Sequence, residues 1–284
     1  MDDALGFLNA PRWWQWPTIL SLDAPAVSLL WQAALGRVAG VDVSWTHVAV
    51  LGFTVWLAYA ADRWIEGWRL DWRDIRTQRH HFYQRRRWPV AAVWLMIFAA
   101  DLVLAFTALE WREIAAGALL TIPVLLYLLS HQLVHRHRRW RLPKELCVAA
   151  LLTGGVCVFL VPTPNPGALA SSASLFALLC FTNCALISSW EREVDLAHGQ
   201  TSLALDATGH SWAIRQLPWM TAVLAAAAYA GDTGPSRTVA ACALASAVLL
   251  GLVDRLEHRT GWKIARVWSD VALMTPAVAL LWPL

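Results

Sequence analysis

Two short acidic motifs contain the residues best suited to chemistry in this sequence. The first reads DRWIE at positions 62–66, and the second reads EREVD at positions 191–195. Each motif therefore places an acid, an arginine and a second acid at the same spacing. Acids at positions i and i+4 of a helix share one face, so each pair can offer two carboxylates to one cation. The four acids are Asp62, Glu66, Glu191 and Asp195.

Magnesium bound to a diphosphate is the chemistry that such paired carboxylates favour. Neighbouring carboxylates repel each other and are costly to bury near lipid, so they need a counterion if they face the interior of a helix bundle. Magnesium is typically held by one or two carboxylates together with substrate phosphates. Basic side chains nearby can neutralise the remaining phosphate charge. Candidates for that role are Arg63, Arg79, Lys144 and Arg192.

The alternative interpretation is that these acids are ordinary ends of membrane helices. Charged residues at the ends of spans commonly form ion pairs with the arginines beside them. For a single motif this interpretation would be preferred. The occurrence of the same pattern at 62–66 and again at 191–195 favours a metal site instead.

The elements that must position these acids are membrane helices. Hydrophobic residues make up 58% of the 284 positions and charged residues only 15%, whereas soluble domains have about 25% charged residues. The apolar residues fall in segments of about 18–22, the length that crosses a bilayer. The predicted spans are 18–36, 44–62, 89–109, 112–132, 145–162, 169–190, 212–230, 237–254 and 266–283.

The sequence thus predicts an all-α, polytopic membrane helix bundle of about nine transmembrane helices. The bundle is expected to form a single integral membrane domain over residues 1–284, with residues 1–16 as an interfacial segment anchored by tryptophan. Turns are expected at 162–167 and 231–235, which are rich in proline and glycine. The net charge of +3 and the clustering of basic residues between apolar segments argue against a nucleic-acid partner.

The distribution of lysine and arginine predicts the orientation in the membrane. Of 23 such residues, 20 lie in the N-terminal segment or in the connections after the second, fourth, sixth and eighth predicted spans. Basic residues near span ends remain in the cytoplasm. We therefore expect the N-terminus inside, the C-terminus outside, and both acidic motifs facing the cytoplasm.

Several other polar residues of the sequence could also do chemistry. His131, His135 and His137 lie among arginines, so lipid headgroups or phosphate are favoured there over zinc. Asp23 and Asp101 fall inside predicted spans, where acids are costly and are functional candidates by default. Asp23 is the better candidate for a pocket.

The sequence resembles the UbiA superfamily of membrane prenyltransferases, whose members have nine spans and two aspartate-rich motifs on cytoplasmic loops. The strongest stretch runs from Asn183 through the second acidic motif to Gly199-Gln200-Thr201, and is similar to the family's second motif and its Gly-x-Thr segment. The stretch Leu142-Pro143-Lys144-Glu145 is similar to the lysine-bearing turn that many members place before their fifth span.

This resemblance implies transfer of a prenyl group from a prenyl diphosphate to a lipophilic, electron-rich acceptor, such as an aromatic ring or a quinone precursor. It implies Mg²⁺ as the cofactor, membrane lipid as the surroundings and the inner membrane of a bacterium as the location. The four acids of the motifs would be catalytic and would bind the metal. The residues expected to contact substrate are Tyr59, Arg63, Arg79, Lys144, Asn183, Arg192 and Thr201.

Three positions depart from the family pattern. Ala58 stands where the first motif usually begins with asparagine, and Glu66 and Glu191 replace aspartates. A glutamate is longer than an aspartate by one methylene, which changes the geometry available to a metal. The departures leave open a non-catalytic UbiA-like protein that binds an isoprenoid lipid. A small transporter is a third possibility, for which acids at mid-membrane depth would be expected.

Overall fold

The computed structural model describes residues 11–71, 75–130, 143–206 and 211–281. Across these ranges the regular secondary structure is helical throughout. The main helices are α2 (Asp23–Ala39), α3 (Trp45–Arg69), α5 (Arg87–Ala108), α6 (Trp111–Leu129), α7 (Lys144–Cys157), α8 (Pro166–Trp190), α11 (Ser211–Gly231), α12 (Gly234–Thr260) and α13 (Trp262–Ala272). The short elements are η2 (Trp13–Gln15), α1 (Trp16–Ile19), α4 (Gln78–Arg85), η4 (Val158–Leu160), α9 (Arg192–Ala197), α10 (Leu203–Asp206) and α14 (Pro276–Leu281).

The all-helical membrane bundle predicted from the sequence is confirmed. Every predicted apolar segment overlaps a helix or two consecutive helices. Six helices of the described chain are long and apolar enough to cross a membrane, and a seventh span results if the pair Trp13–Ile19 and Asp23–Ala39, bent by 76°, is one broken span. The count of nine stays a prediction, because α7 has only 14 residues and a bilayer crossing takes about 20.

Helices begin at proline and glycine residues where the sequence predicted turns. Helix α8 begins at Pro166, inside the predicted turn at 162–167, and α12 begins at Gly234, inside the predicted turn at 231–235. A proline in the first turn of a helix costs no hydrogen bond, since that amide would have no partner in any case. Both predicted turns are therefore confirmed.

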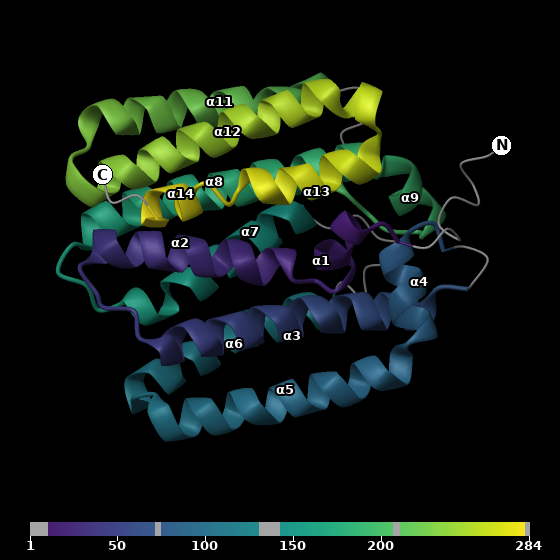
Figure 1. Cartoon of the computed structure of the whole chain (residues 1–284), viewed down its shortest axis with the longest axis horizontal. Coiled ribbons are helices and arrows are strands. Elements are labelled where there is room, and N and C mark those ends of the chain that lie inside the picture. The colour runs from purple at the N-terminus through teal and green to yellow at the C-terminus, as the bar shows by residue number, and fades with distance from the viewer. Residues whose placement is uncertain (1–10, 72–74, 131–142, 207–210, 282–284) are drawn as a thin grey trace.

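The bundle has a packed centre and a lipid-facing edge. Helix α2 packs against α3 and α8, and α12 packs against α8, α11 and α13. Figure 1 shows α11 and α12 along one edge of the bundle and α5 along the opposite edge. Neither α5 nor α6 has a buried residue, as expected of helices that are apolar all round and face lipid.

Both acidic motifs lie at the same end of the bundle. Helix α4 follows α3, and α9 follows α8, and Figure 1 shows α4, α9 and α1 together at one end with α14 toward the other. Helix α4 packs on α3, and α9 packs on α8. The ends of α3 and α8 that carry the acids are thus covered by short helices, and α4 provides two of the acids' partners, Arg79 and His80.

Candidate active site

The four acids of the two motifs line one cavity. Its volume is about 270 Å³, and its walls come from α2, α3, α6, α7, α8 and α13, with α4 and α9 at the end that carries the motifs. Asp62 and Glu66 come from α3, while Glu191 and Asp195 come from the junction of α8 with α9. Sequence spacing placed each pair on one helix face, and tertiary packing brings the two pairs to the same space.

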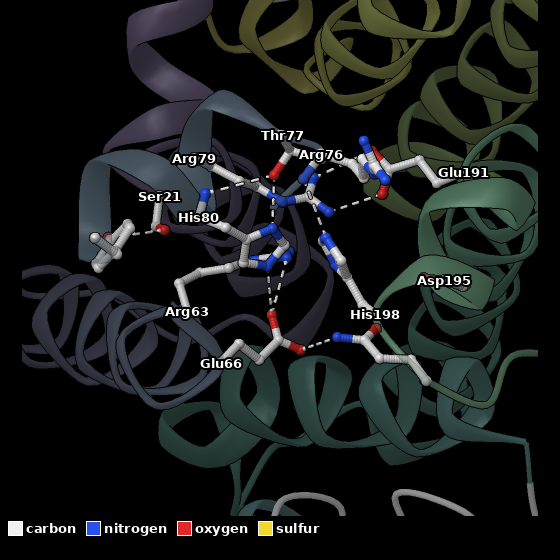
Figure 2. Close-up of polar contacts among 12 residues, drawn as sticks. Ser21, Arg63, Glu66, Arg76, Thr77, Arg79, His80, Glu191, Asp195 and His198 are labelled. Atoms are coloured by element: carbon white, nitrogen blue, oxygen red, sulfur yellow. Dashed lines mark hydrogen bonds and ion pairs between the residues drawn. The ribbon is translucent and has the colours of Figure 1, made fainter. Parts of the chain in front are cut away.

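Glu66 of the first motif is held by two uncharged donors. His80 Nε2 lies 2.7 Å from Glu66 Oε2, and Gln200 Nε2 donates to Glu66 Oε1 at 2.7 Å (Figure 2). Arg63 is more distant, with Nη1 3.7 Å from Oε2. Glu66 is only 7% exposed. Each of its two oxygens therefore has a side chain of the protein, rather than water, as its hydrogen-bond partner.

The cap of α4 fixes the tautomer of His80. Thr77 is the N-cap and accepts from the backbone N–H of His80, and its hydroxyl lies 2.6 Å from His80 Nδ1. Burial lowers the pKa of His80 to about 4, against the opposing effect of Glu66. The imidazole is therefore neutral at pH 7, so Thr77 donates to Nδ1 while Nε2–H donates to Glu66.

Glu191 of the second motif is held by two guanidinium groups. Arg79 forms two contacts, from Nη1 to Oε1 at 3.2 Å and from Nη2 to Oε2 at 2.7 Å. Arg266 adds a third, with Nη1 3.1 Å from Oε1. The paired geometry of Arg79 on one carboxylate is the strong, orienting form of ion pair.

The charges around Glu191 are strongly coupled. Burial by itself would raise the pKa of the Glu191 carboxyl, but Arg266 and Arg79 outweigh it and hold the pKa far below its usual range. Burial, together with Arg266 and Arg63, lowers the pKa of Arg79 to about 10. Glu191 and Arg79 remain ionised at pH 7, and Glu191 lies between the guanidinium groups of Arg79 and Arg266, which would otherwise repel each other.

Asp195 is less fully compensated than Glu191. Its cationic partner is Lys144, with Nζ 3.7 Å from Oδ2, beyond ordinary hydrogen-bond distance. Burial raises the pKa of Asp195, with Glu191 acting in the same direction and Lys144 against it. A carboxylate that is 6% exposed and has one distant cation can accept a further positive charge.

A glycine turn connects the second motif to the first. After α9, Gly199 has φ +63°, a left-handed conformation that glycine adopts without strain. The backbone N–H of Gln200 then donates to the Asp195 carbonyl at 2.9 Å. The turn aims Gln200 at Glu66, so the segment that resembled the family's Gly-x-Thr stretch joins the two motifs.

Most residues expected to contact substrate line this cavity. They are Tyr59, Arg63, Arg79, Lys144 and Asn183.

Arg192 and Thr201 do not form part of the cavity wall. Arg192 is exposed, because α9 starts at this residue and the break after α8 turns its side chain outward. The geometry therefore does not support direct substrate contact by Arg192 or Thr201.

Sequence reasoning missed four residues of the site. His80 lies beside the basic residues of the connection after the second predicted span, and Arg266 is one of the basic residues that predict the orientation. Gln200 and Asp270 were not singled out as site residues. His80 and Gln200 bind Glu66, Arg266 binds Glu191, and Asp270 lines the cavity from α13. The three contacts and the position of Asp270 depend on tertiary packing, so the local spacing of residues contains no signal for them.

The remaining candidates have different positions. Asp23 lines the cavity from the first turn of α2. Asp101 lies on α5, where its Oδ2 accepts from Thr54 at 2.9 Å, and it is not part of the cavity wall. The three histidines at 131, 135 and 137 lie outside the described residues.

The cavity is suited to magnesium only in combination with an anion. Among the residues described, no three histidine, cysteine, aspartate or glutamate side chains converge closely enough to hold a metal alone. Glu66 and Glu191 are engaged by protein donors. Asp62 and Asp195, one from each motif, also line the cavity and are the shorter acids of the two pairs. Magnesium needs only one or two carboxylates when phosphate and water complete its shell.

The charged side chains of the cavity wall also favour binding of magnesium together with an anion. Acidic side chains in the cavity wall outnumber basic ones, so a diphosphate alone would add negative charge to an excess of it. The acids are Asp23, Asp62, Glu66, Glu145, Glu191, Asp195 and Asp270, and the bases are Arg63, Arg79, Lys144 and Arg266.

Comparison with known proteins shows the fold. No family model matches the chain, and no curated protein matches it. A solved structure of a UbiA homolog from Archaeoglobus fulgidus, bound to DMAPP and Mg²⁺, is similar with a TM-score of 0.59. The similarity covers 94% of this chain and 99% of that one, at 14% sequence identity. The chain therefore has a UbiA-like membrane helical bundle, as its sequence motifs indicated.

Proposed function

We propose that this protein is an integral membrane prenyltransferase that binds a prenyl diphosphate with Mg²⁺ and transfers the prenyl group to a lipophilic, electron-rich acceptor. The observation that supports this most is the convergence of both acidic motifs on one cavity with four basic side chains. The UbiA homolog with the same fold was bound to DMAPP, a prenyl diphosphate, and Mg²⁺. A cavity with the acidic motifs at one end and apolar residues in the rest of its wall suits a substrate with a charged head and a hydrocarbon tail.

The basic side chains would hold the diphosphate. Arg79 Nε and Arg266 Nε are buried donors without a hydrogen-bond partner in the described part of the chain, and such donors are costly unless a ligand supplies an acceptor. Both Nη atoms of Arg79 and Nη1 of Arg266 contact Glu191, which orients both guanidinium groups. Lys144 lies across the cavity wall beside Asp195 and can balance a further phosphate oxygen.

Asp62 and Asp195 would hold the metal, which when bound stabilises the negative charge of the departing diphosphate. Glu66 and Glu191 have the separate role of fixing His80, Gln200 and the arginines. The apolar part of the wall, which includes Val27, Leu120 and Val124, would enclose the prenyl chain and exclude water from it.

Turnover by the purified protein tests this function. Labelled geranyl, farnesyl and geranylgeranyl diphosphates would be incubated with the protein in detergent, with and without Mg²⁺, and release of diphosphate measured. We expect Mg²⁺-dependent release that falls at least tenfold in Asp62→Ala and Asp195→Ala. Glu193→Ala, at an exposed position of the same helix, provides the matched control. Release that is absent, or insensitive to metal and to both substitutions, would contradict a prenyltransferase.

A second candidate is a non-catalytic protein that binds an isoprenoid lipid. The observation in its favour is that Glu66 and Glu191, two of the four expected metal ligands, are saturated by side-chain donors. For this candidate, prenyl diphosphates or prenyl alcohols bind without any release of diphosphate, and Mg²⁺ changes their affinity less than twofold.

A further inference from the structure

The cavity extends to the same depth along three of the helices that form its wall. The wall residues of each helix follow one another at a spacing of three or four, so they form one face. On each helix the deepest wall residue lies eleven residues from a charged residue at the acidic end, a distance of about 16 Å. The three pairs are Leu51 and Asp62 on α3, Gly155 and Lys144 on α7, and Cys180 and Glu191 on α8.

A stacked pair of aromatic rings closes the cavity between α2 and α8. The deepest wall residue of α2 is Val27, and Trp31 follows it by one turn. On α8, Phe176 lies one turn beyond Cys180, and its ring stacks on that of Trp31 with centroids 4.8 Å apart. Both side chains are fully buried, and Trp31 Nε1 donates to the backbone carbonyl of Leu273 at 2.8 Å. Residues one turn apart share a helix face, so these rings lie where the wall would otherwise continue.

A second stacked pair closes the cavity between α3 and the end of α7. His47 lies one turn beyond Leu51 on α3, and Phe159 follows Gly155 by four residues, in η4. Their rings stack with centroids 4.8 Å apart. His47 Nε2 also lies 2.8 Å from Glu113 Oε1 of α6, which ties this pair to a third helix. We call the four rings of Trp31, Phe176, His47 and Phe159 the aromatic floor.

The depth of the cavity limits the hydrocarbon tail that it can hold. Each isoprene unit adds four carbon–carbon bonds to an extended chain, or about 5 Å with bonds of about 1.5 Å. A tail of three units is therefore about 15 Å long and reaches the aromatic floor, while a tail of two units leaves the deepest part of the cavity empty. A fourth unit would have to displace stacked rings in a close-packed interior.

We propose that the aromatic floor selects a prenyl diphosphate of three isoprene units, the farnesyl chain, and that Gly155 leaves the room for its third unit. A Cβ at position 155 would lie 3.6 Å from Leu51 Cδ1, an ordinary van der Waals distance. A longer side chain would therefore be tolerated at its base and would occupy the deepest part of the cavity with its remaining atoms. This inference deepens the proposed function and rests on it, because it assigns the length of the donor.

Binding of three analogues that resist ionisation tests the selection without turnover. The S-thiolodiphosphates of geraniol, farnesol and geranylgeraniol would be titrated calorimetrically into the purified protein in detergent with Mg²⁺. We expect the farnesyl analogue to bind at least tenfold more tightly than either of the others. The geranyl tail buries less apolar surface, and the geranylgeranyl tail exceeds the depth of the cavity. Equally tight binding of the farnesyl and geranylgeranyl analogues would overturn the inference.

Filling the deepest part of the cavity should shorten the preferred tail. Gly155→Leu should weaken binding of the farnesyl analogue at least tenfold and leave that of the geranyl analogue within threefold. Leucine is a better helix former than glycine, so the variant is expected to fold. Gly117→Leu provides the matched control, because a Cβ added there meets nothing within 4 Å and the residue is not part of the cavity wall. If Gly155→Leu keeps the wild-type order of affinities, the inference is wrong.

Opening the floor should lengthen the preferred tail. Phe159→Ala removes one ring of the second stacked pair, and we expect the affinity for the geranylgeranyl analogue to rise at least tenfold relative to that for the farnesyl analogue. Loss of a buried phenyl ring also lowers stability, so thermal unfolding of the variant would be measured alongside. If this variant does not fold, Gly155→Leu decides the question by itself.

Diphosphate release separates failure of this inference from failure of the proposed function. Release that is equally fast from all three prenyl diphosphates, and unchanged in order by Gly155→Leu, would overturn the selection and leave the enzyme intact. If the analogues bind in the expected order and no diphosphate is released, the proposed transfer fails while selection of the chain by the floor stands. If the wild-type protein binds none of the three analogues, both fail together.

Discussion

The two acidic motifs have the same residue pattern but are compensated in opposite ways. Glu66 of the first motif is held by neutral donors, His80 and Gln200, with Arg63 at 3.7 Å. Glu191 of the second is held by Arg79 and Arg266 at 2.7 to 3.2 Å. Glu66 accepts hydrogen bonds from uncharged donors, and Glu191 shares its single negative charge between two cations.

This difference between the motifs indicates that the glutamate and the aspartate of each pair have different roles. In both motifs, a glutamate is fixed by the protein and an aspartate completes the pair on the cavity wall. The replacements of aspartate by glutamate therefore fall at positions whose partners are side chains. A longer carboxylate can reach His80 or Arg79. Under the proposed function, the shorter Asp62 and Asp195 bind the metal.

Neutralising each glutamate should give the largest difference between the motifs. Glu191→Gln leaves Arg79 and Arg266 buried without their shared anion, which we expect to cost about 3–5 kcal/mol of unfolding free energy. Glu66→Gln loses neutral hydrogen bonds, which we expect to cost about 1–3 kcal/mol. Denaturant titration of the purified protein in detergent measures both.

Two controls make that prediction sharper. Glu193→Gln, at an exposed position between the motif acids, should change the unfolding free energy by less than about 0.5 kcal/mol. The double variant Glu191→Gln/Arg79→Gln should be more stable than Glu191→Gln, since it removes one of the two unpaired cations. Equal costs for Glu66→Gln and Glu191→Gln would show that the motifs do not differ as described.

Acid should weaken the first motif through His80. The pKa of this histidine is about 4 in the folded protein and 6.5 in the unfolded chain, so the unfolded chain binds more protons between these values. Stability should therefore fall as the pH is lowered from 6.5 to 4, by on the order of 3 kcal/mol. Unfolding measured at intervals across this range, without Mg²⁺, should show a slope that is much reduced in His80→Gln.

The smallest expected effect concerns two basic residues that sequence reasoning grouped together. Lys144 lines the cavity beside Asp195, whereas Arg192 is exposed. Lys144→Met should weaken prenyl diphosphate binding about tenfold, or about 1.4 kcal/mol, and should change stability by less than 1 kcal/mol, because the ion pair is long and partly exposed. Arg192→Met should leave binding within twofold. Equal effects would place Arg192 in the site after all.

The sequence predicted the fold well because its signals are local. Apolar segments of membrane-spanning length, with proline and glycine between them, define the helices without knowledge of their partners. The acidic motifs were found for the same reason, since one helical turn separates the acids of each pair. Lys144 and Asn183 were predicted through a resemblance that extends across most of the chain.

The partners of the motif acids could not be predicted, because their positions depend on tertiary packing. Arg266 reaches Glu191 only because α13 packs against α8, and Gln200 reaches Glu66 only because Gly199 reverses the chain after α9. A histidine among arginines, such as His80, resembles any other basic residue in a connection between spans until its burial is known. Asp270 likewise gives no signal until it is seen facing Asn183.

Magnesium-linked binding of geranyl S-thiolodiphosphate, an analogue that resists ionisation, tests the central claim most directly. Titration calorimetry with and without Mg²⁺ would compare the wild-type protein with Asp62→Asn and Asp195→Asn. We predict that Mg²⁺ tightens binding to the wild-type protein at least tenfold and that each substitution removes most of this gain. Binding that is equally tight without Mg²⁺, or that keeps its Mg²⁺ dependence in both variants, would contradict the assignment of these two aspartates to the metal.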